Sequence, residues 1–120
     1  MGRYPMTLRE RQSLFVRLVG LLIEFAYQGG YELTFGEAYR TPEQAKLNAQ
    51  KGIGIANSRH TQRLAIDLNL FKDGQYLTDS ASYKPLGDFW KALHPDCCYG
   101  GDFKPRADGN HFSLSYNGVK

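Results

Sequence analysis

The sequence predicts an α+β fold with a small antiparallel sheet and helices packed on one face of that sheet. Apolar residues recur at helical spacing near the start of the chain, and three later stretches alternate apolar and polar residues, as half-buried strands do. A chain of 120 residues is long enough for one hydrophobic core but too short for two. We therefore expect a single domain over residues 1–120.

The first two elements are a long helix and a strand. Thr7-Leu8-Arg9-Glu10 has the form of a capping box with Thr7 as the N-cap, and apolar residues follow at the spacing of one helical face. Gly29-Gly30 ends this helix. In residues 31–35, apolar side chains then alternate with polar ones, which predicts a half-buried strand.

A second helix and the clearest strand come next. Thr41 is the expected N-cap, Pro42 takes the first helical position, and the helix runs to about Gln50. Residues 51–58 are Gly-rich and read as a loop. In residues 64–71 the even-numbered positions are apolar, whereas Ala65, Asp67 and Asn69 share the other face.

The last part of the chain combines one helix, a turn-rich segment and one strand. After a turn at residues 72–75, a third helix is expected over Lys84–Leu93. Residues 97–110 are turn-rich, and the final strand begins at His111. Cys97 and Cys98 are adjacent, which disfavours a disulfide, so we expect two reduced thiols.

Composition and charge narrow the class of protein. An apolar share of 42% and a charged share of 22% are ordinary for a globular protein. The net charge of +3 comes without a dense Lys/Arg run, which gives little support to nucleic-acid binding. Arg17 and Glu24 interrupt the apolar run of residues 14–26, so we expect neither membrane insertion nor an export signal.

The polar faces of two strands carry candidate metal ligands. If the apolar faces pack against the long helix, Asp67 and His111 share the opposite side of the sheet, where their neighbours Ala65 and Ser113 are small. His60 lies seven residues before Asp67, an odd separation, so it must fold over the site from the preceding loop. Two histidines and one carboxylate suit zinc, although non-haem iron(II) accepts the same set.

Asp108 is a candidate proton carrier. It precedes His111 by three residues across a glycine turn, near the expected metal but without an obligation to coordinate it. There it could take a proton from a metal-activated water and pass it to a leaving amine. The alternative is an ordinary Asp-Gly turn.

These residues carry a family resemblance. Ser-x-His-(x)6-Asp at residues 58–67 and Asp-x-x-His-Phe at residues 108–112 resemble the zinc peptidases that include D-Ala-D-Ala carboxypeptidases and L-alanyl-D-glutamate endopeptidases. Residues 38–44, Ala-Tyr-Arg-Thr-Pro-Glu-Gln, resemble that family's Tyr-Arg-Thr/Ser-x-x-x-Gln motif, and residues 99–103 resemble its Trp-Gly-Gly-Asp-Trp stretch. The resemblance covers roughly residues 35–113 and implies the fold shared by these peptidases and the Hedgehog signalling domain.

The resemblance also implies roles for individual residues. The zinc ligands would be the set named above, His60, Asp67 and His111, with Asp108 as the catalytic acid and base. Arg40 would stabilise the oxyanion or anchor substrate, unless it only pairs with Glu37 or Glu43 on the surface. Ser58 and Gln44 would line the substrate site.

One position departs from the family pattern. Arg63 stands where Ser-x-His-x-x-Gly-x-Ala-x-Asp prefers glycine. A side chain there could narrow the cleft or require a different turn. The departure bears on the choice of substrate more than on metal binding.

The leading functional prediction is a zinc-dependent peptidase that hydrolyses the peptide stems of bacterial peptidoglycan. We expect a monomeric phage endolysin with L-alanyl-D-glutamate endopeptidase activity and one Zn²⁺ ion, held in the host cytoplasm until membrane permeabilisation releases it to the wall. The alternatives are a D-Ala-D-Ala carboxypeptidase or dipeptidase, a non-catalytic zinc-bearing wall-binding module, and a non-haem iron enzyme. The last is disfavoured because no jelly-roll strand pattern is visible.

Overall fold

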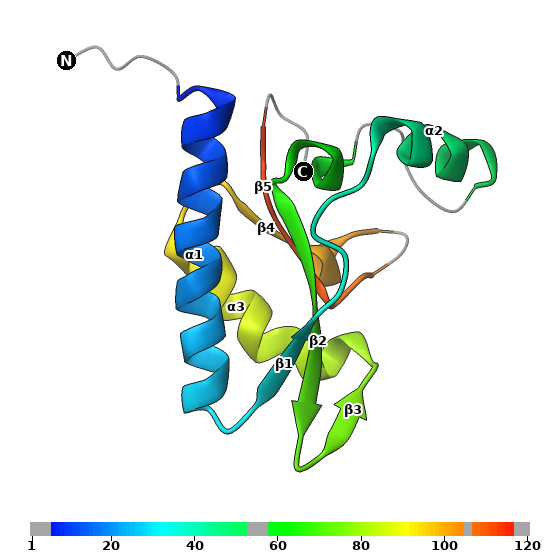
Figure 1. Cartoon of the computed structure of the whole chain (residues 1–120). Coiled ribbons are helices and arrows are strands. Elements are labelled where there is room, and N and C mark those ends of the chain that lie inside the picture. Colours follow the sequence, from blue (N-terminus) through cyan, green and yellow to red (C-terminus); the bar gives the residue numbers. More distant parts are fainter. Residues whose placement is uncertain (1–5, 53–57, 105–106, 117–120) are drawn as a thin grey trace.

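A computed structural model describes residues 6–52, 58–104 and 107–116 (Figure 1). Within these ranges the helices are α1 (Leu8–Gln28), α2 (Pro42–Gln50) and α3 (Lys84–Leu93). The strands are β1 (Glu32–Phe35), β2 (Ala65–Lys72), β3 (Gln75–Leu77), β4 (Cys97–Tyr99) and β5 (His111–Leu114). Three single turns of 3-10 helix complete the list: η1 (Arg59–Gln62), η2 (Ser80–Tyr83) and η3 (Gly100–Asp102).

The strands form one antiparallel sheet, which confirms the predicted fold class. The order across the sheet is β1-β2-β5-β4, and β3 pairs with β2 beyond the end of β5. The long strand β2 is central and pairs with β1, β3 and β5. In the β2–β5 register Ala65 lies opposite Ser113 and Asp67 lies opposite His111. All four side chains therefore share one face of the sheet.

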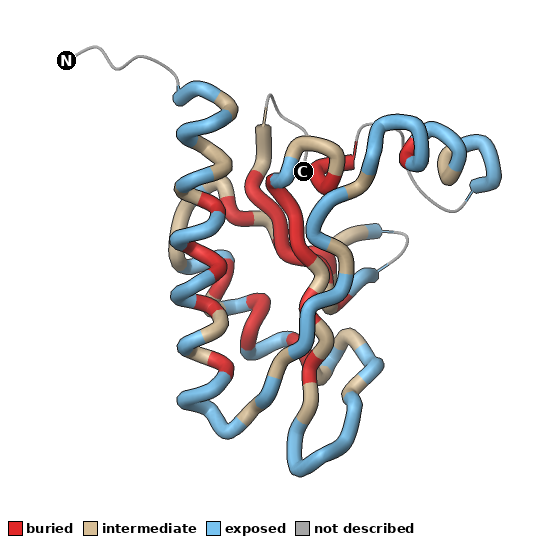
Figure 2. Tube along the Cα trace, in the orientation of Figure 1, coloured by how far each residue is buried: buried red, intermediate tan, exposed pale blue. Residues whose placement is uncertain are grey.

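Helices α1 and α3 cover the other face of the sheet, as predicted. The hydrophobic core lies between these helices and the strands, where Figure 2 shows the buried segments. Trp90 of α3 is fully buried against the edge of the Phe15 ring, and its indole N–H donates to the carbonyls of Cys98 and Ser113. The helix layer is thereby attached to β4 and β5. Helix α2 lies outside this layer and buries only Ala45.

Local signals at the helix starts are confirmed. The Thr7 hydroxyl accepts from the Glu10 N–H at 3.1 Å, and the Glu10 carboxylate accepts from the Thr7 N–H at 2.9 Å. Thr41 caps α2 in the same way, accepting from the Gln44 N–H. These caps satisfy N–H groups that a helix start otherwise leaves without partners.

Two strands differ from the sequence prediction. The predicted turn at residues 72–75 is the tip of a β2–β3 hairpin, with Asp73 and Gly74 at positive φ angles of 52° and 77°, as a type I′ turn requires. The segment expected to be turn-rich begins with β4, which pairs with β5 at the sheet edge. Strands of three residues are too short to show an alternating pattern.

The two cysteines form no disulfide. Cys97 faces the core, where burial raises the pKa of its thiol to about 12. A thiol that stays protonated at neutral pH is a poor nucleophile. No helix in the described part of the chain combines the length and hydropathy needed to cross a membrane.

Candidate metal centre

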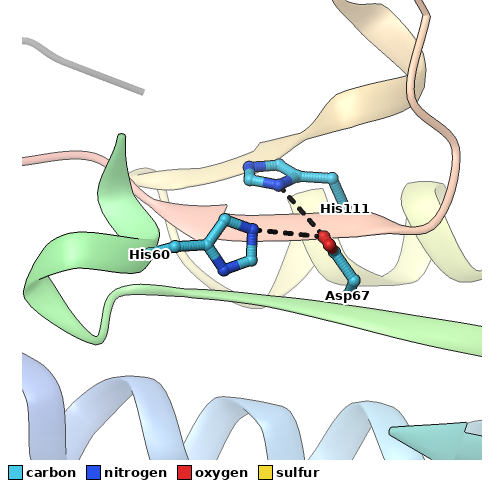
Figure 3. Close-up of side chains that lie close together, drawn as sticks. All are labelled: His60, Asp67 and His111. Atoms are coloured by element: carbon cyan, nitrogen blue, oxygen red, sulfur yellow. Dashed lines mark ion pairs between the residues drawn. The ribbon is translucent and has the colours of Figure 1, made fainter. Parts of the chain in front are cut away.

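The β2–β5 register brings two candidate ligands together. Asp67 and His111 are directly opposed across these strands, on the face turned away from α1 and α3. The His111 Nδ1 atom lies 3.3 Å from Asp67 Oδ1 (Figure 3). His111 is buried, and the Asp67 side chain is 20% exposed.

A single 3-10 turn supplies the third residue, His60. The Ser58 hydroxyl caps η1 by accepting from the His60 N–H at 3.2 Å, and Arg63 ends the turn in the left-handed conformation. This turn directs the buried His60 side chain over the sheet, with Nε2 at 3.3 Å from Asp67 Oδ1 (Figure 3). His60 thus reaches the site from the preceding loop, as its odd spacing from Asp67 predicts.

The three side chains fit a divalent metal ion. One ligand atom from each residue lies within 4.8 Å of the others. In a tetrahedral zinc site with bonds of about 2.0 Å, neighbouring ligand atoms are about 3.3 Å apart, which matches both distances to Asp67 Oδ1. These distances are long for hydrogen bonds, and Asp67 Oδ1 is buried without a hydrogen-bond partner. An oxygen in this position suits a cation.

The charge state of Asp67 also suits a ligand. Burial acts to raise the pKa of its carboxyl group, but interactions with His111 and His60 outweigh burial and hold the pKa at about 2. The carboxyl group is therefore ionised at neutral pH, as metal coordination requires.

Asp108 lies beside this group, on a loop fixed by backbone hydrogen bonds. Its N–H donates to the Gly100 carbonyl at 2.8 Å, and its carbonyl accepts from the His111 N–H at 3.1 Å. Desolvation by surrounding protein atoms and the negative charge of Asp67 raise the pKa of the exposed Asp108, against the opposing effects of His111, His60 and Arg40. The residue lines a cleft of about 200 Å³ together with Tyr76, Ser80 and Asn110. A carboxyl group with a raised pKa beside a cleft can both accept and donate protons.

Arg40 reaches the group from the segment after β1. Its N–H donates to the His60 carbonyl at 3.2 Å, and its guanidinium forms an ion pair with Glu37. The surface pairing considered as an alternative for Arg40 is thus present, on a side chain that is only 16% exposed. Its role in catalysis stays a prediction.

The two expected substrate-lining residues lie in different settings. Ser58 is buried, and its hydroxyl caps η1, the turn that carries the candidate ligand His60. Gln44 is exposed on α2, and its amide donates to Asn48 Oδ1 at 2.6 Å. The structure does not bring Gln44 to the three ligands, and substrate contact by either residue stays a prediction.

The sequence analysis missed a contact of Glu37. Its Oε1 atom lies 3.6 Å from His60 Nδ1, and its carbonyl accepts from the Asp67 N–H at 2.9 Å. Glu37 was considered only as a surface partner of Arg40. The sequence signal that could have indicated this contact is the position of Glu37 between the end of a predicted strand and the candidate site residue Arg40.

The structure also explains the departure at position 63. Arg63 has a φ of 58°, a conformation that glycine adopts most easily, which accounts for the glycine that the family pattern prefers there. The Arg63 guanidinium lies over the Tyr39 ring at 4.1 Å from its centroid. The Arg63 side chain thus contacts the segment after β1, while its backbone has the left-handed conformation.

Together these elements define an α+β fold with a candidate metal centre on the face of the sheet opposite α1 and α3. No family model and no curated protein matches the sequence. Among solved structures, the chain is similar to the crystal structure of Serratia marcescens L-Ala D-Glu endopeptidase ChiX, with a TM-score of 0.73 and 20% identity. The match covers 90% of this chain and 83% of that one. At this identity the similarity establishes a shared fold, and it confirms the fold that the motifs predicted.

Proposed function

We propose that this chain is a zinc-dependent peptidase that hydrolyses the peptide stems of bacterial peptidoglycan. The observation that carries the proposal is the spacing of His60, Asp67 and His111, with Asp108 joined to His111 by a main-chain hydrogen bond. The fold shared with an L-Ala D-Glu endopeptidase supports the same conclusion. It also favours the bond between L-Ala and D-Glu as the one cleaved.

The site residues would divide the chemistry as follows. His60, Asp67 and His111 would hold zinc, which supplies Lewis acidity for a carbonyl group and lowers the pKa of water. Asp108 would accept the proton of the attacking water, because its raised pKa makes its carboxylate a stronger base. It would then donate that proton to the departing nitrogen. Arg40, held by Glu37, would stabilise the negative charge that develops on the carbonyl oxygen.

The biological setting we propose is that of a phage endolysin, which meets its substrate after the host membrane has been permeabilised. A positive net charge of +3 suits an anionic wall polymer. On this view the protein acts as a monomer on a thin peptidoglycan layer.

Mass spectrometry of muropeptides released from purified sacculi by the zinc-loaded protein tests the proposal. New L-Ala C-termini are expected. Loss of terminal D-Ala would instead indicate a carboxypeptidase, and zinc binding without products would indicate a binding module. Metal analysis of the purified protein separates zinc from iron.

The variant Asp108→Asn tests the proton carrier. An amide has nearly the shape of a carboxyl group but cannot shuttle protons, so kcat should fall by about 10²–10⁴ while zinc stays bound. The matched control is Asp88→Asn, which alters an exposed carboxylate paired with Lys84 on α3 and should keep wild-type activity. Undiminished lysis by Asp108→Asn would contradict the assigned role.

A further inference from the structure

We infer that Glu37 is a positioning residue for the metal centre, whose carboxylate accepts the outer N–H of His60 and thereby strengthens zinc binding. This inference rests on the proposed function, because it assumes that His60 is a zinc ligand. It adds a residue outside the expected set of ligands, proton carrier and substrate contacts.

The two ring nitrogens of His60 face different partners. Nε2 faces Asp67 Oδ1 at 3.3 Å, and Nδ1 faces Glu37 Oε1 at 3.6 Å. Nδ1 is buried and has no hydrogen-bond partner at present. With a metal on Nε2, the proton must sit on Nδ1, and a ligating histidine commonly donates that proton to a carboxylate. Glu37 lies where this acceptor is needed, and a movement of less than 1 Å would close the hydrogen bond.

The backbone of Glu37 is fixed independently of its side chain. Its carbonyl accepts from the Asp67 N–H at 2.9 Å, and the neighbouring Gly36 N–H donates to the Asp67 carbonyl at 2.7 Å. Three residues later, the Arg40 N–H donates to the His60 carbonyl at 3.2 Å. Residues 36–40 are thus attached to two of the three ligands through main-chain atoms. Substitution of the Glu37 side chain leaves these bonds in place.

The ion pair with Arg40 holds the Glu37 carboxylate in the position from which it faces His60. The Oε1 atom that pairs with the Arg40 guanidinium is the same atom that faces His60. A carboxylate is a stronger acceptor than a neutral group, and a charged acceptor increases the basicity of the histidine as a ligand. The competing explanation is that Glu37 only neutralises Arg40, in which case zinc affinity would not depend on it.

Zinc affinity, measured on metal-free protein by competition with a chromophoric chelator at fixed pH, distinguishes the two explanations. Glu37→Ala should bind zinc about 10- to 100-fold more weakly than wild type. Glu37→Gln keeps an acceptor oxygen but loses the charge, so its affinity should lie between the two. Glu43→Gln, which changes an exposed carboxylate in the first turn of α2, is the matched control and should bind as wild type does.

Urea unfolding of the metal-free variants shows whether any loss reflects damage to the fold. Arg40→Ala gives a second comparison, because it removes the ion pair but keeps the carboxylate beside His60, so its loss of affinity should be smaller than that of Glu37→Ala. Equal losses in these two variants, or wild-type affinity in both Glu37 variants, would overturn the inference. If the wild-type chain binds zinc but the variants show no loss, only the role of Glu37 fails. If the wild-type chain binds no zinc, the proposed function fails together with the inference.

Discussion

Replacement of Gly100 by a larger residue should cost much of the stability, because its backbone runs against the Asp108 carbonyl and against His111 at the start of β5. A Cβ atom at this position would lie 2.2 Å from the Asp108 carbonyl oxygen and 2.6 Å from the His111 Cβ. The first contact is with backbone, so no change of rotamer can relieve it. The hydrogen bond from the Asp108 N–H to the Gly100 carbonyl, at 2.8 Å, holds the two segments at this separation.

The cost of Gly100→Ala follows from these distances. Overpacking in a filled region costs about 1–3 kcal/mol, and a clash with two fixed groups places this substitution near 3 kcal/mol or above. Gly100 does not have a positive φ, so the cost is steric and not conformational. For a domain of ordinary stability, this is a large part of a total of about 5–15 kcal/mol.

Urea unfolding of metal-free protein measures this cost, and Gly20→Ala is the control. Gly20 is exposed in the middle of α1, and no atom lies within 4 Å of the Cβ that Ala would add there. The control should gain up to about 1 kcal/mol from helix propensity. The same substitution thus has opposite signs at the two positions. If Gly100→Ala unfolds at the wild-type urea concentration and binds zinc as tightly as wild type, the close packing of Gly100 against Asp108 and His111 does not determine the geometry of the site.

Three further predictions follow from the site. Excess zinc at 100–1,000 times Kd should add about 3–4 kcal/mol to the free energy of unfolding and so raise the midpoint of thermal unfolding. A chelator should reverse this shift, and an unchanged midpoint would argue against the metal centre. The lowered pKa of Asp67, about 2 against an ordinary 3.8, stabilises the metal-free fold by about 2 kcal/mol above pH 4; this contribution is lost as the pH falls toward 2, so Asp67→Asn should flatten the acid limb of a stability–pH curve. Arg63→Gly should be about 1 kcal/mol more stable than Arg63→Ala in urea, because both lose the contact with Tyr39 but only glycine relaxes the left-handed backbone; equal stability would exclude strain at this position.

The sequence predicts those features that local patterns encode. The caps at Thr7 and Thr41 and the bounds of α3 are set by residues close in the chain. Alternation along residues 64–71 assigns Asp67 to the face opposite the helices, and the odd spacing between His60 and Asp67 indicates that His60 comes from the preceding loop. Each of these inferences needs only the geometry of one segment.

The features that the sequence does not predict depend on segments far apart. Strand β4 forms because Cys97 and Tyr99 pack into the core beside β5, a condition that three residues cannot signal. The contact of Glu37 with His60 joins residues on either side of α2. The left-handed turn at Arg63 is visible only as a departure from a family pattern, and its φ supplies the reason.

The geometry of the candidate centre is largely a property of strand register. Asp67 and His111 face each other because β2 and β5 pair in one register, and a slip of one residue would turn one of them toward the helix layer. Main-chain bonds on both sides of the pair oppose such a slip: the Leu68 N–H donates to the Asn110 carbonyl, and the Leu114 N–H donates to the Leu64 carbonyl, both at 2.9 Å. The fully buried side chains of Leu68 and Leu114 hold the same register from the core side. The energy that folds the domain therefore also sets the spacing of its candidate ligands, which is why a single methyl group at position 100 should disturb stability and metal binding together.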